Sequence, residues 1–574
     1  MNDSGPADYA ESPAGYRPVS WVRPRPTIET RDGAVYLGSG ITLDNPDRNL
    51  IALLLRAAER WPERSFMAER DPATGGWIDL TFAQFVDRVA MAAAGMEVIP
   101  AGAAVALLAS NSINAAVAGF AIMASGAVLV PLSPAYLGKP GGDEALAALA
   151  RSAGVEFAFV DDVATGAALA CPAWPLSDMA TVRESRFDLD AAARTLASDQ
   201  VAKILFTSGS TGFPKAVPNT HGMLTASAAM IQQTLHRLPD DAQHVQVDWL
   251  PWHHTFGGNV NLHNAISSGG RFVIDGGSPT PEGFATTLKN FAEIGPTAIS
   301  TVPAAYPVVL QAMQADLRLA SAILRNLYGA SFGGAALPPP VAQAVQAFAE
   351  QVTGARIMFG SGYGMTETAG IVARVHWPTE RTDLLGLPMP GVEIKMTPHG
   401  DGRFDCRVRG PNIFNGYGIH GDRSAFDEEG FFITGDAVAP ADPDDWSQGL
   451  IYAGRIAEDF KLQNGVFVQA GRLRLALLDH LGPAVRDVLI VGEGRDGVGC
   501  LVWAMDPEVA SADWLQARID EFNAVAQGAS RRVWRSALFS DPPHARPDEL
   551  TPKGGLNAPK MRDTRRGEID NLFA

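Results

Sequence analysis

The sequence has 574 residues, and its 46 lysines and arginines against 63 aspartates and glutamates give a formal net charge of −17. A hydrophobic fraction of 46% excludes wholesale disorder, and the length allows about three or four structural units. An acidic surface repels nucleic-acid phosphates and anionic lipid, so we expect no nucleic-acid partner. The three cysteines lie far apart without a Cys-x-x-Cys pair, which fits a reducing, cytoplasmic location.

The chain opens with a polar stretch that does not resemble a secretory signal, followed by Pro, Arg and Gly over residues 1–45. We expect an extended arm there that runs over the surface, with the fold starting after it. Residues 50–61 have a helical pattern ended by Pro62. A second helix follows, with Thr81 as its N-cap and Gly95 as its end.

Residues 101–130 are mostly apolar, but Asn111 and Asn114 interrupt them. The uninterrupted part is shorter than the roughly 20 residues that a membrane-spanning helix needs. We therefore predict no membrane span, and instead a β-α-β unit with strands at 105–108 and 128–130 and a helix from 112 to 125.

Helices then alternate with short apolar strands at 203–207, 271–274 and 356–359. This alternation predicts an α/β fold with layered, mostly parallel sheets in a large N-terminal domain, residues 46–458. From about residue 385 to 458, short β-type segments separated by Gly and Pro indicate a β-rich subdomain. Residues 459–574 are expected to form a small α+β C-terminal domain, which the family resemblance given below implies to be mobile.

An apolar strand runs into a hydroxyl- and glycine-rich turn at residues 204–215 (ILFTSGSTGFPK). Glycines let backbone N–H groups approach phosphate oxygens closely, hydroxyls add donors and Lys215 adds a cation. The Gly-Lys-Ser/Thr ending of the P-loop is missing, so this is not the loop of kinases and GTPases. The alternative, a flexible surface turn, would account for the Ser, Thr and Gly residues but not for the whole sequence of 204–215. The sequence therefore predicts a polyphosphate site formed by Thr207, Ser208, Gly209, Ser210, Thr211, Gly212 and Lys215.

The same string resembles the signature of the adenylate-forming superfamily, which includes acyl-CoA synthetases, luciferases and peptide-synthetase adenylation domains. Further motifs of that superfamily follow in its order: PWHHTFG at 251–257, GGAAL at 333–337, GYGMTET at 362–368, TGD at 434–436 and GR at 454–455. Within the superfamily, GRIAEDFKL at 454–462 and LTPKGGLN at 550–557 resemble the bacterial feruloyl-CoA synthase branch.

The resemblance implies roles at the nucleotide. Glu367 would hold Mg²⁺, with Thr211 beside it, because magnesium takes hard oxygen ligands. Tyr363 offers an aromatic plane for adenine, Thr366 a hydroxyl for the α-phosphate, and Asp436 with Arg455 would bind the ribose. Taken singly, Asp436 could be a turn residue and Tyr363 a core aromatic. Further implied ATP contacts are Gly334, Ala335, Gly364 and Met365.

A second set of motif residues is expected at the acyl pocket: Trp252, His254, Phe256, Gly257 and Gly333. By resemblance, His254 is a gate that moves between the two half-reactions. Four of the eleven histidines (His244, His253, His254 and His263) lie within 20 residues. Their spacing fits no compact ligand pair and no cysteine completes a tetrahedral set, so we predict no zinc site.

A dinucleotide-type GxGxxG pattern occurs at residues 492–497. It lies between two apolar extended segments, at 487–491 and 498–503, instead of preceding a helix. We interpret its glycines as the turn of a hairpin, not as an NAD site.

The C-terminal lysine departs from the superfamily pattern, because the alignment places Gly555 where that lysine would stand. Lys553 is the expected substitute that bridges the attacking carboxylate and the α-phosphate, with Lys560 as the second candidate. A solvated basic tail is the structural alternative. Glu458 and Asp459 occupy the hinge position, and the domain would swing about them to bring residues 461–471 toward the thiol of CoA.

The resemblance therefore implies ATP-dependent ligation of a carboxylic acid to CoA through an acyl-AMP, with ATP, Mg²⁺ and CoA as cofactors. An acid of the hydroxycinnamate (feruloyl) type is the expected substrate, with fatty acids and benzoates as alternatives. Other options are a stand-alone adenylating enzyme that loads a carrier-protein thiol, and a non-catalytic relative. A homodimer is also left open.

Overall fold

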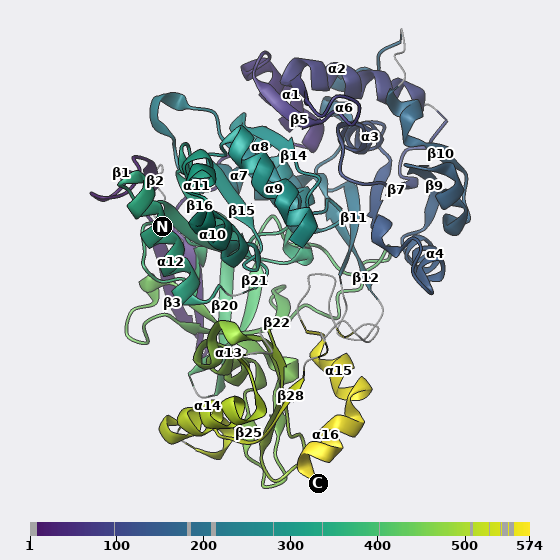
Figure 1. Ribbon diagram of the computed structural model, residues 1–574. Coiled ribbons are helices and arrows are strands. Elements are labelled where there is room, and N and C mark those ends of the chain that lie inside the picture. Colours follow the sequence, from purple (N-terminus) through teal and green to yellow (C-terminus); the bar gives the residue numbers. More distant parts are fainter. Residues whose placement is uncertain are drawn as a thin grey trace.

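The computed structural model describes residues 8–574 except 97, 181–184, 208–213, 279–280, 336, 401, 506–508, 527, 540, 542–548 and 550–555. Figure 1 shows a large α/β body with a smaller domain below it, formed by the C-terminal end of the chain. The predicted α/β class is confirmed, and the sheets of the body are layered with helices as expected.

The N-terminal segment is extended and mostly exposed or half-buried, but part of it also joins the main fold as sheet strands. Its strands are β1 (Tyr9–Glu11), β2 (Ser20–Val22), β3 (Pro26–Arg31) and β4 (Ala34–Ser39). β3 and β4 form a hairpin, and β4 pairs antiparallel with β20 (Glu393–Gly400), which begins more than 350 residues later. Leu37 is fully buried in the core, so the fold begins before residue 45. The prolines flank these strands at their ends, where a missing N–H is tolerated.

One parallel layer contains the predicted β-α-β unit. Among the described residues its strand order is β10-β9-β7-β8-β11-β12, and only β12 runs antiparallel. The strands are β7 (Ala104–Leu108), β8 (Val128–Leu132), β9 (Val155–Val160), β10 (Ala173–Pro175), β11 (Val201–Thr207) and β12 (Lys215–Thr220). The accompanying helices are α3 (Ile113–Ala124), α4 (Gly142–Ser152), α5 (Val163–Gly166) and α6 (Leu189–Thr195).

The apolar stretch before residue 130 contains a core helix, as predicted. Ser112 caps α3 by accepting a hydrogen bond from the backbone N–H of Ala115 at 3.0 Å, and nearly every residue of the helix is buried. In the described part of the chain, no helix is both long and apolar enough to cross a membrane.

A second layer has the strand order β13-β14-β5-β6 within the described residues. Its strands are β5 (Ser65–Arg70), β6 (Trp77–Thr81), β13 (Val245–Asp248) and β14 (Arg271–Ile274). The helices that pack between the layers are α1 (Leu50–Arg60), α2 (Phe82–Ala93), α7 (His221–Thr234) and α8 (Leu262–Ser268). Thr81 caps α2 through a reciprocal bond with Gln84, as predicted. The α-helix ends at Ala93, and a tighter turn over Ala94–Met96 contains Gly95, the predicted end.

The third sheet is long and mixed, and it joins the α/β body to the predicted β-rich subdomain without a break. Where the chain is described, its order is β15-β16-β17-β18-β19-β23-β22-β21-β20-β4-β3. Its α/β part contains β15 (Ala298–Thr301), β16 (Gly329–Gly333), β17 (Met358–Tyr363) and β18 (Ala373–Arg374), with α9 (Pro281–Ile294), α10 (Ala305–Ala315), α11 (Leu317–Leu324) and α12 (Pro339–Thr353). The strand expected at 356–359 therefore lies further along the chain, as β17.

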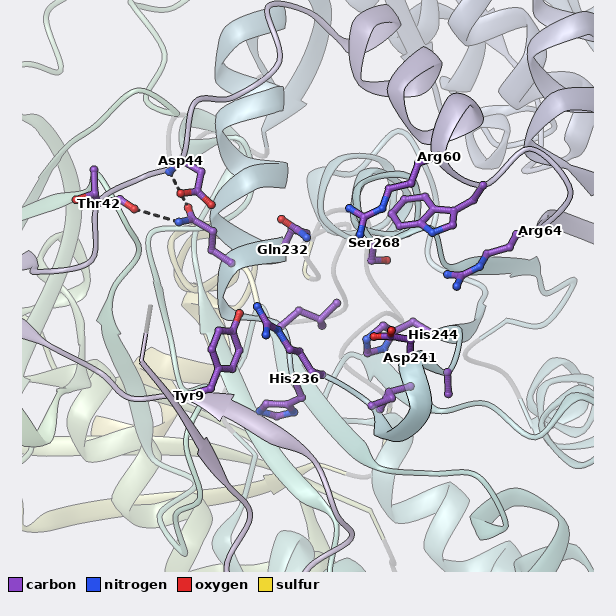
Figure 2. A pocket seen from close by; sticks show the side chains of 16 residues that line it. Tyr9, Thr42, Asp44, Arg60, Arg64, Gln232, His236, Asp241, His244 and Ser268 are labelled. Carbon is purple, nitrogen blue, oxygen red and sulfur yellow. Dashed lines mark hydrogen bonds between the residues drawn. The ribbon is translucent and has the colours of Figure 1, made fainter. Parts of the chain in front are cut away.

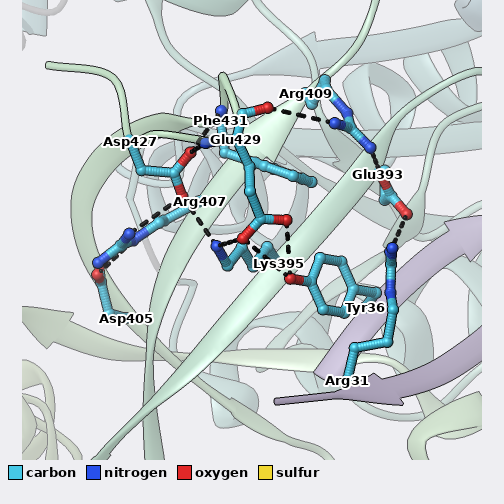
Figure 3. A network of polar contacts seen from close by, with 10 residues as sticks. All are labelled: Arg31, Tyr36, Glu393, Lys395, Asp405, Arg407, Arg409, Asp427, Glu429 and Phe431. Carbon is cyan, nitrogen blue, oxygen red and sulfur yellow. Dashed lines mark hydrogen bonds and ion pairs between the residues drawn. The ribbon is translucent and has the colours of Figure 1, made fainter. Parts of the chain in front are cut away.

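The β-rich part contains β19 (Leu384–Pro388), β20, β21 (Arg403–Arg409), β22 (Phe432–Pro440) and β23 (Leu450–Arg455). A polar network links three of its segments to the N-terminal hairpin (Figure 3). In it, Lys395 forms ion pairs with Asp427 and Glu429, and Tyr36 donates a hydrogen bond to Glu429 Oε2 at 3.1 Å.

The C-terminal domain has its own core. Its elements are β24 (Phe460–Lys461), β25 (Phe467–Val468), α13 (Ala470–Leu481), β26 (Val485–Val491), β27 (Val498–Ala504), α14 (Ala512–Val525), β28 (Val533–Phe539), α15 (Ala558–Thr564) and α16 (Arg566–Phe573). β26 and β27 pair antiparallel around residues 492–497. The GxGxxG pattern is therefore a hairpin turn, as predicted.

Candidate active site

The buried carboxylate of Asp436 contacts two other residues of the predicted nucleotide site. Pairing of β22 with β23 places Asp436 opposite Arg455, whose Nε lies 2.8 Å from Asp436 Oδ1. From the end of β17, the Tyr363 hydroxyl donates to Asp436 Oδ2 at 2.8 Å. Burial and the Asp436 charge raise the pKa of Tyr363 well above its ordinary value, and the same charge raises the pKa of Arg455. A fixed carboxylate of this kind can accept hydrogen bonds from a pair of hydroxyls.

The second predicted acid, Glu367, lies in a short turn that follows β17. Its side chain is buried, with 6% of the residue exposed. Tyr417 donates its hydroxyl proton to Glu367 Oε1 at 2.8 Å, and the ring of Tyr417 lies 4.6 Å from the Lys215 ammonium. Tyr417 thus connects the predicted magnesium ligand with the lysine of the predicted phosphate loop. Sequence reasoning missed this tyrosine, because an isolated tyrosine carries no local pattern.

The turn that carries Glu367 depends on close backbone contact. A Cβ on Gly364 would lie 2.3 Å from the carbonyl oxygen of Gly370, so a side chain cannot be accommodated there. The backbone N–H of Met365 donates to the Thr368 hydroxyl at 3.0 Å. Thr366 is buried, and its carbonyl accepts from Asn219 Nδ2 at 3.3 Å.

The predicted phosphate loop is described only at its two ends. Thr207 and Lys215 face each other as the last pair of the β11–β12 ladder. Five of the predicted residues lie outside the described part of the chain: Ser208, Gly209, Ser210, Thr211 and Gly212. Lys553 and Gly555 also lie outside it. Lys560, the second lysine candidate, is exposed on α15.

At the acyl side, Phe256 reaches the strands that end beside the nucleotide residues. Gly333 of β16 and Gly362 of β17 are register partners, and the Phe256 ring lies 3.5 Å from the position that a Cβ on Gly333 would take. Gly334 follows with φ +82° and open space around it, beside Ala335. The predicted residues Phe256, Gly333 and Gly334 are therefore brought together.

The residues before Phe256 lie in a compact loop. The rings of His253 and His254 are 4.4 Å apart, and burial with the neighbouring His254 lowers the pKa of His253 to about 3. His254 is only partly buried. Trp252 instead packs towards the core, with its ring 6.0 Å from that of Phe272. A Cβ on Gly257 would lie 2.6 Å from the carbonyl oxygen of Leu250, which keeps this loop tight.

Glu367 fits a magnesium site of the kind that is completed by substrate phosphates. Mg²⁺ commonly takes one or two protein carboxylates and fills its other positions with water and phosphate oxygens. A dedicated protein cage would show several clustered ligands, and no group of three His, Cys, Asp or Glu suited to a metal occurs among the described residues. The buried Glu367 carboxylate beside the Lys215 end of the loop meets the smaller requirement.

Between them, the two predicted hinge residues contact both domains. Asp459 Oδ2 lies 2.9 Å from the Arg403 guanidinium of β21, and both side chains are 1% exposed. The carbonyl of Glu458 accepts from Arg562 of α15 at 3.0 Å. Burial raises the pKa of the carboxyls of Glu458 and Asp459.

Close to this hinge, the two domains approach each other through glycines. A Cβ on Gly471, at the start of α13, would lie 2.8 Å from the Cα of Gly454, the last residue but one of β23, which has φ +98°. The domains therefore meet here backbone to backbone.

A large cavity lies elsewhere, between the N-terminal strand β1 and the C-terminal ends of α1 and α7. Its volume is about 910 Å³, and the described residues that line it are different from those of the predicted site. Figure 2 shows Arg60 and Arg64 on one side of this cavity and Tyr9 on the other. His244, which lines this cavity, immediately precedes β13 (Val245–Asp248), whereas Trp252 follows the opposite end of that strand.

Comparison with known proteins gives matches along most of the chain. Residues 54–418 match the family described as AMP-binding enzyme. A 2-succinylbenzoate–CoA ligase of Staphylococcus epidermidis is 30% identical over 52% of this chain and 58% of its own length. A probable CoA ligase of Humulus lupulus is 27% identical over 52% of this chain and 49% of its own length. The match thus spans only about half the length of these curated relatives.

Longer matches occur as well. A salicyl-AMP ligase / salicyl-S-ArCP synthetase of Mycobacterium tuberculosis is 28% identical over 78% of this chain and 79% of its own length. Among solved structures, o-succinylbenzoate CoA synthetase of Bacillus subtilis superposes with a TM-score of 0.70 at 19% identity, covering 90% of this chain and 98% of that one. This structural likeness confirms the fold, including the small C-terminal domain.

Proposed function

The chain belongs to the AMP-binding enzyme family, and on that premise we propose that it activates a carboxylic acid with ATP and transfers the acyl group to CoA. In the first step, a carboxylate oxygen attacks the α-phosphorus of ATP and pyrophosphate leaves. In the second, the CoA sulfur attacks the acyl carbon, the thiol proton is lost to solvent and AMP leaves. Both nucleophiles come from the substrates.

The observation that carries this proposal is the pairing of Asp436 with Arg455 and Tyr363, four residues before Glu367 in the sequence. Asp436 accepts the ribose hydroxyls, and Arg455 and Tyr363 fix its two oxygens for that task. Glu367 would hold Mg²⁺, which would supply positive charge to offset the negative charge that concentrates as two anions approach each other. Tyr417 orients Glu367, and Lys215 adds positive charge at the end of the phosphate loop. Lys553 is assigned to the attacking carboxylate and the α-phosphate.

For the substrate we propose an aromatic acid of the hydroxycinnamate type. Support comes from the GRIAEDFKL and LTPKGGLN runs and from Phe256, whose ring lines the glycine strands at the acyl side. Two of the relatives are named for ring-bearing acids, succinylbenzoate and salicylate.

A second candidate is transfer to a carrier-protein thiol instead of CoA. It is favoured by one observation: the relative that matches 78% of this chain is named as a salicyl-AMP ligase and a salicyl-S-ArCP synthetase. The two candidates share the first step and differ in the thiol. Cytoplasmic location and homodimer formation stay predictions, and light scattering on the purified protein tests the second.

The test is an assay of AMP and pyrophosphate release with ATP, Mg²⁺ and a panel of acids, each with and without CoA. The panel contains ferulate, 4-coumarate, benzoate, salicylate and octanoate. CoA-dependent AMP release with a thioester product from ferulate or coumarate supports the proposal. Pyrophosphate exchange without thioester supports carrier loading. Silence with every acid contradicts the proposed substrate classes, and Glu367→Gln should lose the magnesium-dependent turnover that the native protein shows.

A further inference from the structure

A lysine is buried beneath the loop that carries the acyl-side residues. Lys203 lies in the middle of β11 and is only 5% exposed. Its Nζ donates to the carbonyl oxygen of Gly258 at 3.1 Å and to Asn259 Oδ1 at 3.3 Å, and lies 3.1 Å from His263 Nε2. A charged ammonium has three protons, so each has one acceptor when the proton of His263 is on Nδ1. Burial lowers the pKa of Lys203 to about 7.

The loop above this lysine contains one turn of π-helix, over Phe256–Asn261. The backbone N–H of Leu262 donates to the carbonyl of Gly257, five residues earlier, instead of the four of an α-helix. A π-turn is wider than an α-turn and is rarely stable without a specific cause. Insertion of a side chain into the hydrogen-bond ladder is one such cause. Lys203 is in that position, because its ammonium bonds the carbonyl of Gly258 within the turn.

Two asparagines of the same turn, Asn259 and Asn261, bind other buried polar groups. Asn259 Nδ2 donates to Asn219 Oδ1 at 2.9 Å, and Asn219 in turn donates to the carbonyl of Thr366 in the Glu367 turn. Asn261 Nδ2 donates to Asp248 Oδ2 at 2.7 Å. Lys203 and Asn219 are register partners on β11 and β12. One buried network therefore connects the strands of the phosphate loop, the π-turn and the turn of Glu367.

The width of this turn decides which side chains face the acyl side. If the segment relaxed to an α-helix, every residue before it would move by one position along the helix, a rotation of about 100°. Phe256, which now lies against Gly333, would turn away from it, and the preceding His254 would move as well. A change of one buried lysine would then alter the acyl side without touching it.

We infer that Lys203 is a positioning residue that holds Phe256–Asn261 in its π form and thereby sets the acid specificity of the site. The inference rests on the proposed function for its kinetic readout, but its structural readout is independent of any substrate. Lys203 does not contact the reacting groups. It acts through the backbone of Gly258 and the side chain of Asn259.

The decisive variant is Lys203→Met, which keeps the length of the side chain and removes its charge and protons. Its matched control is Lys395→Met, since Lys395 is also buried (9% exposed) but belongs to the network of Figure 3 in the β-rich part of the sheet. Loss of either lysine lowers stability. Only Lys203→Met is expected to change how the acid binds.

The kinetic experiment measures KM for the best acid of the panel and for ATP separately. In Lys203→Met we expect KM for that acid to rise about tenfold or more and the order of preference among the acids to change, while KM for ATP changes less than about twofold. Lys395→Met should leave both KM values and the order of acids unchanged. Equal rises in the two KM values, or the native order of acids in Lys203→Met, would overturn the inference.

A crystal structure of Lys203→Met gives the second readout. We expect Leu262 N to bond Gly258 O, four residues back, and Phe256 to leave Gly333. A retained π-turn would refute the inference even if no acid is turned over, whereas inactivity of the native protein would count against the proposed function alone. If Lys203→Met does not fold, Asn259→Ala removes one of the lysine's acceptors and should shift the acid KM in the same direction, by a smaller factor; an unchanged value would overturn the role.

Discussion

Tyr417 donates a hydrogen bond to Glu367 across 50 residues of sequence, and at 2.8 Å it is the contact that orients the predicted magnesium ligand. The tyrosine lies between β21 and β22, whereas the glutamate follows β17. Their contact joins the two parts of the long mixed sheet at the candidate site. The nearby ammonium of Lys215, 4.6 Å from the same ring, adds a favourable cation–π contact.

Tyr417→Phe should weaken magnesium use. Without the hydroxyl, Glu367 loses its orienting donor, so we expect the Mg²⁺ concentration for half-maximal activity to rise about three- to tenfold, with about 1 kcal/mol lost from the free energy of unfolding. Tyr36→Phe is the matched control, because Tyr36 also donates to a carboxylate, Glu429, at 3.1 Å. The measurement is the activity of both variants as a function of Mg²⁺ concentration. The same magnesium requirement in the two variants would contradict the role of Tyr417.

Asp436→Asn should weaken ATP binding. The amide cannot keep the ion pair with Arg455, and one of its two acceptor positions becomes a donor. We expect KM for ATP to rise about tenfold or more, with a smaller effect on KM for the acid. Asp405→Asn serves as control, since Asp405 pairs with Arg407 at 2.8 Å in the neighbouring strand. Unchanged ATP dependence in Asp436→Asn would rule out the ribose assignment.

Lys553→Ala should suppress acyl-AMP formation, because it removes the cation assigned to the attacking carboxylate and the α-phosphate. We expect a loss of about 100-fold or more in pyrophosphate exchange. Lys560→Ala, seven residues on and exposed on α15, should leave exchange within about twofold of the native rate. The reverse result would transfer the role to Lys560, the second candidate of the sequence.

One buried and two half-buried histidines should make the protein sensitive to acid. Burial lowers the pKa of His236 and His376 to about 3 and that of His244 to about 4, and the charge of Arg374 adds to the effect. Since the ordinary value is about 6.5, the unfolded chain binds these protons first. The contribution to stability is therefore complete above pH 6.5 and is lost as the pH falls from 6.5 towards 4.

Thermal unfolding at pH 7.5 and pH 5 measures this loss. His376→Gln removes one titrating group and should reduce the fall in melting temperature between the two values. His420→Gln replaces an exposed histidine and should leave the fall in melting temperature as it is in the native protein. An equal fall in the native protein and in His376→Gln would show that this histidine does not contribute.

Local sequence patterns predicted an element correctly where residues within or next to that element mark its ends. The β-α-β unit was predicted to within two residues at each boundary, because Ser112 caps the helix and Gly126 ends it. The hairpin at 492–497 could be separated from a dinucleotide site because apolar strands flank it on both sides. The order of the motifs likewise predicted that Asp436, Arg455 and Tyr363 belong to one site, and the structure brings these residues together.

Long-range contacts account for most of what was missed. The pairing of the N-terminal segment with β20 was missed, because that partner strand is more than 350 residues away and leaves no trace in local composition. Tyr417 is a single residue whose role depends on Glu367. Lys203 did leave a signal: a charged residue inside an apolar strand (VAKILF) must find buried partners. Which partners those are could come only from the fold.

The pairing of β4 with β20 has a practical consequence for work with this protein. Deleting residues 1–45 would remove two strands from one end of the long mixed sheet and leave the backbone donors and acceptors of β20 unsatisfied. Open sheet edges of this kind recruit strands from other molecules. A shortened protein should therefore oligomerise or precipitate, and affinity tags are better joined ahead of the first strand than in place of it.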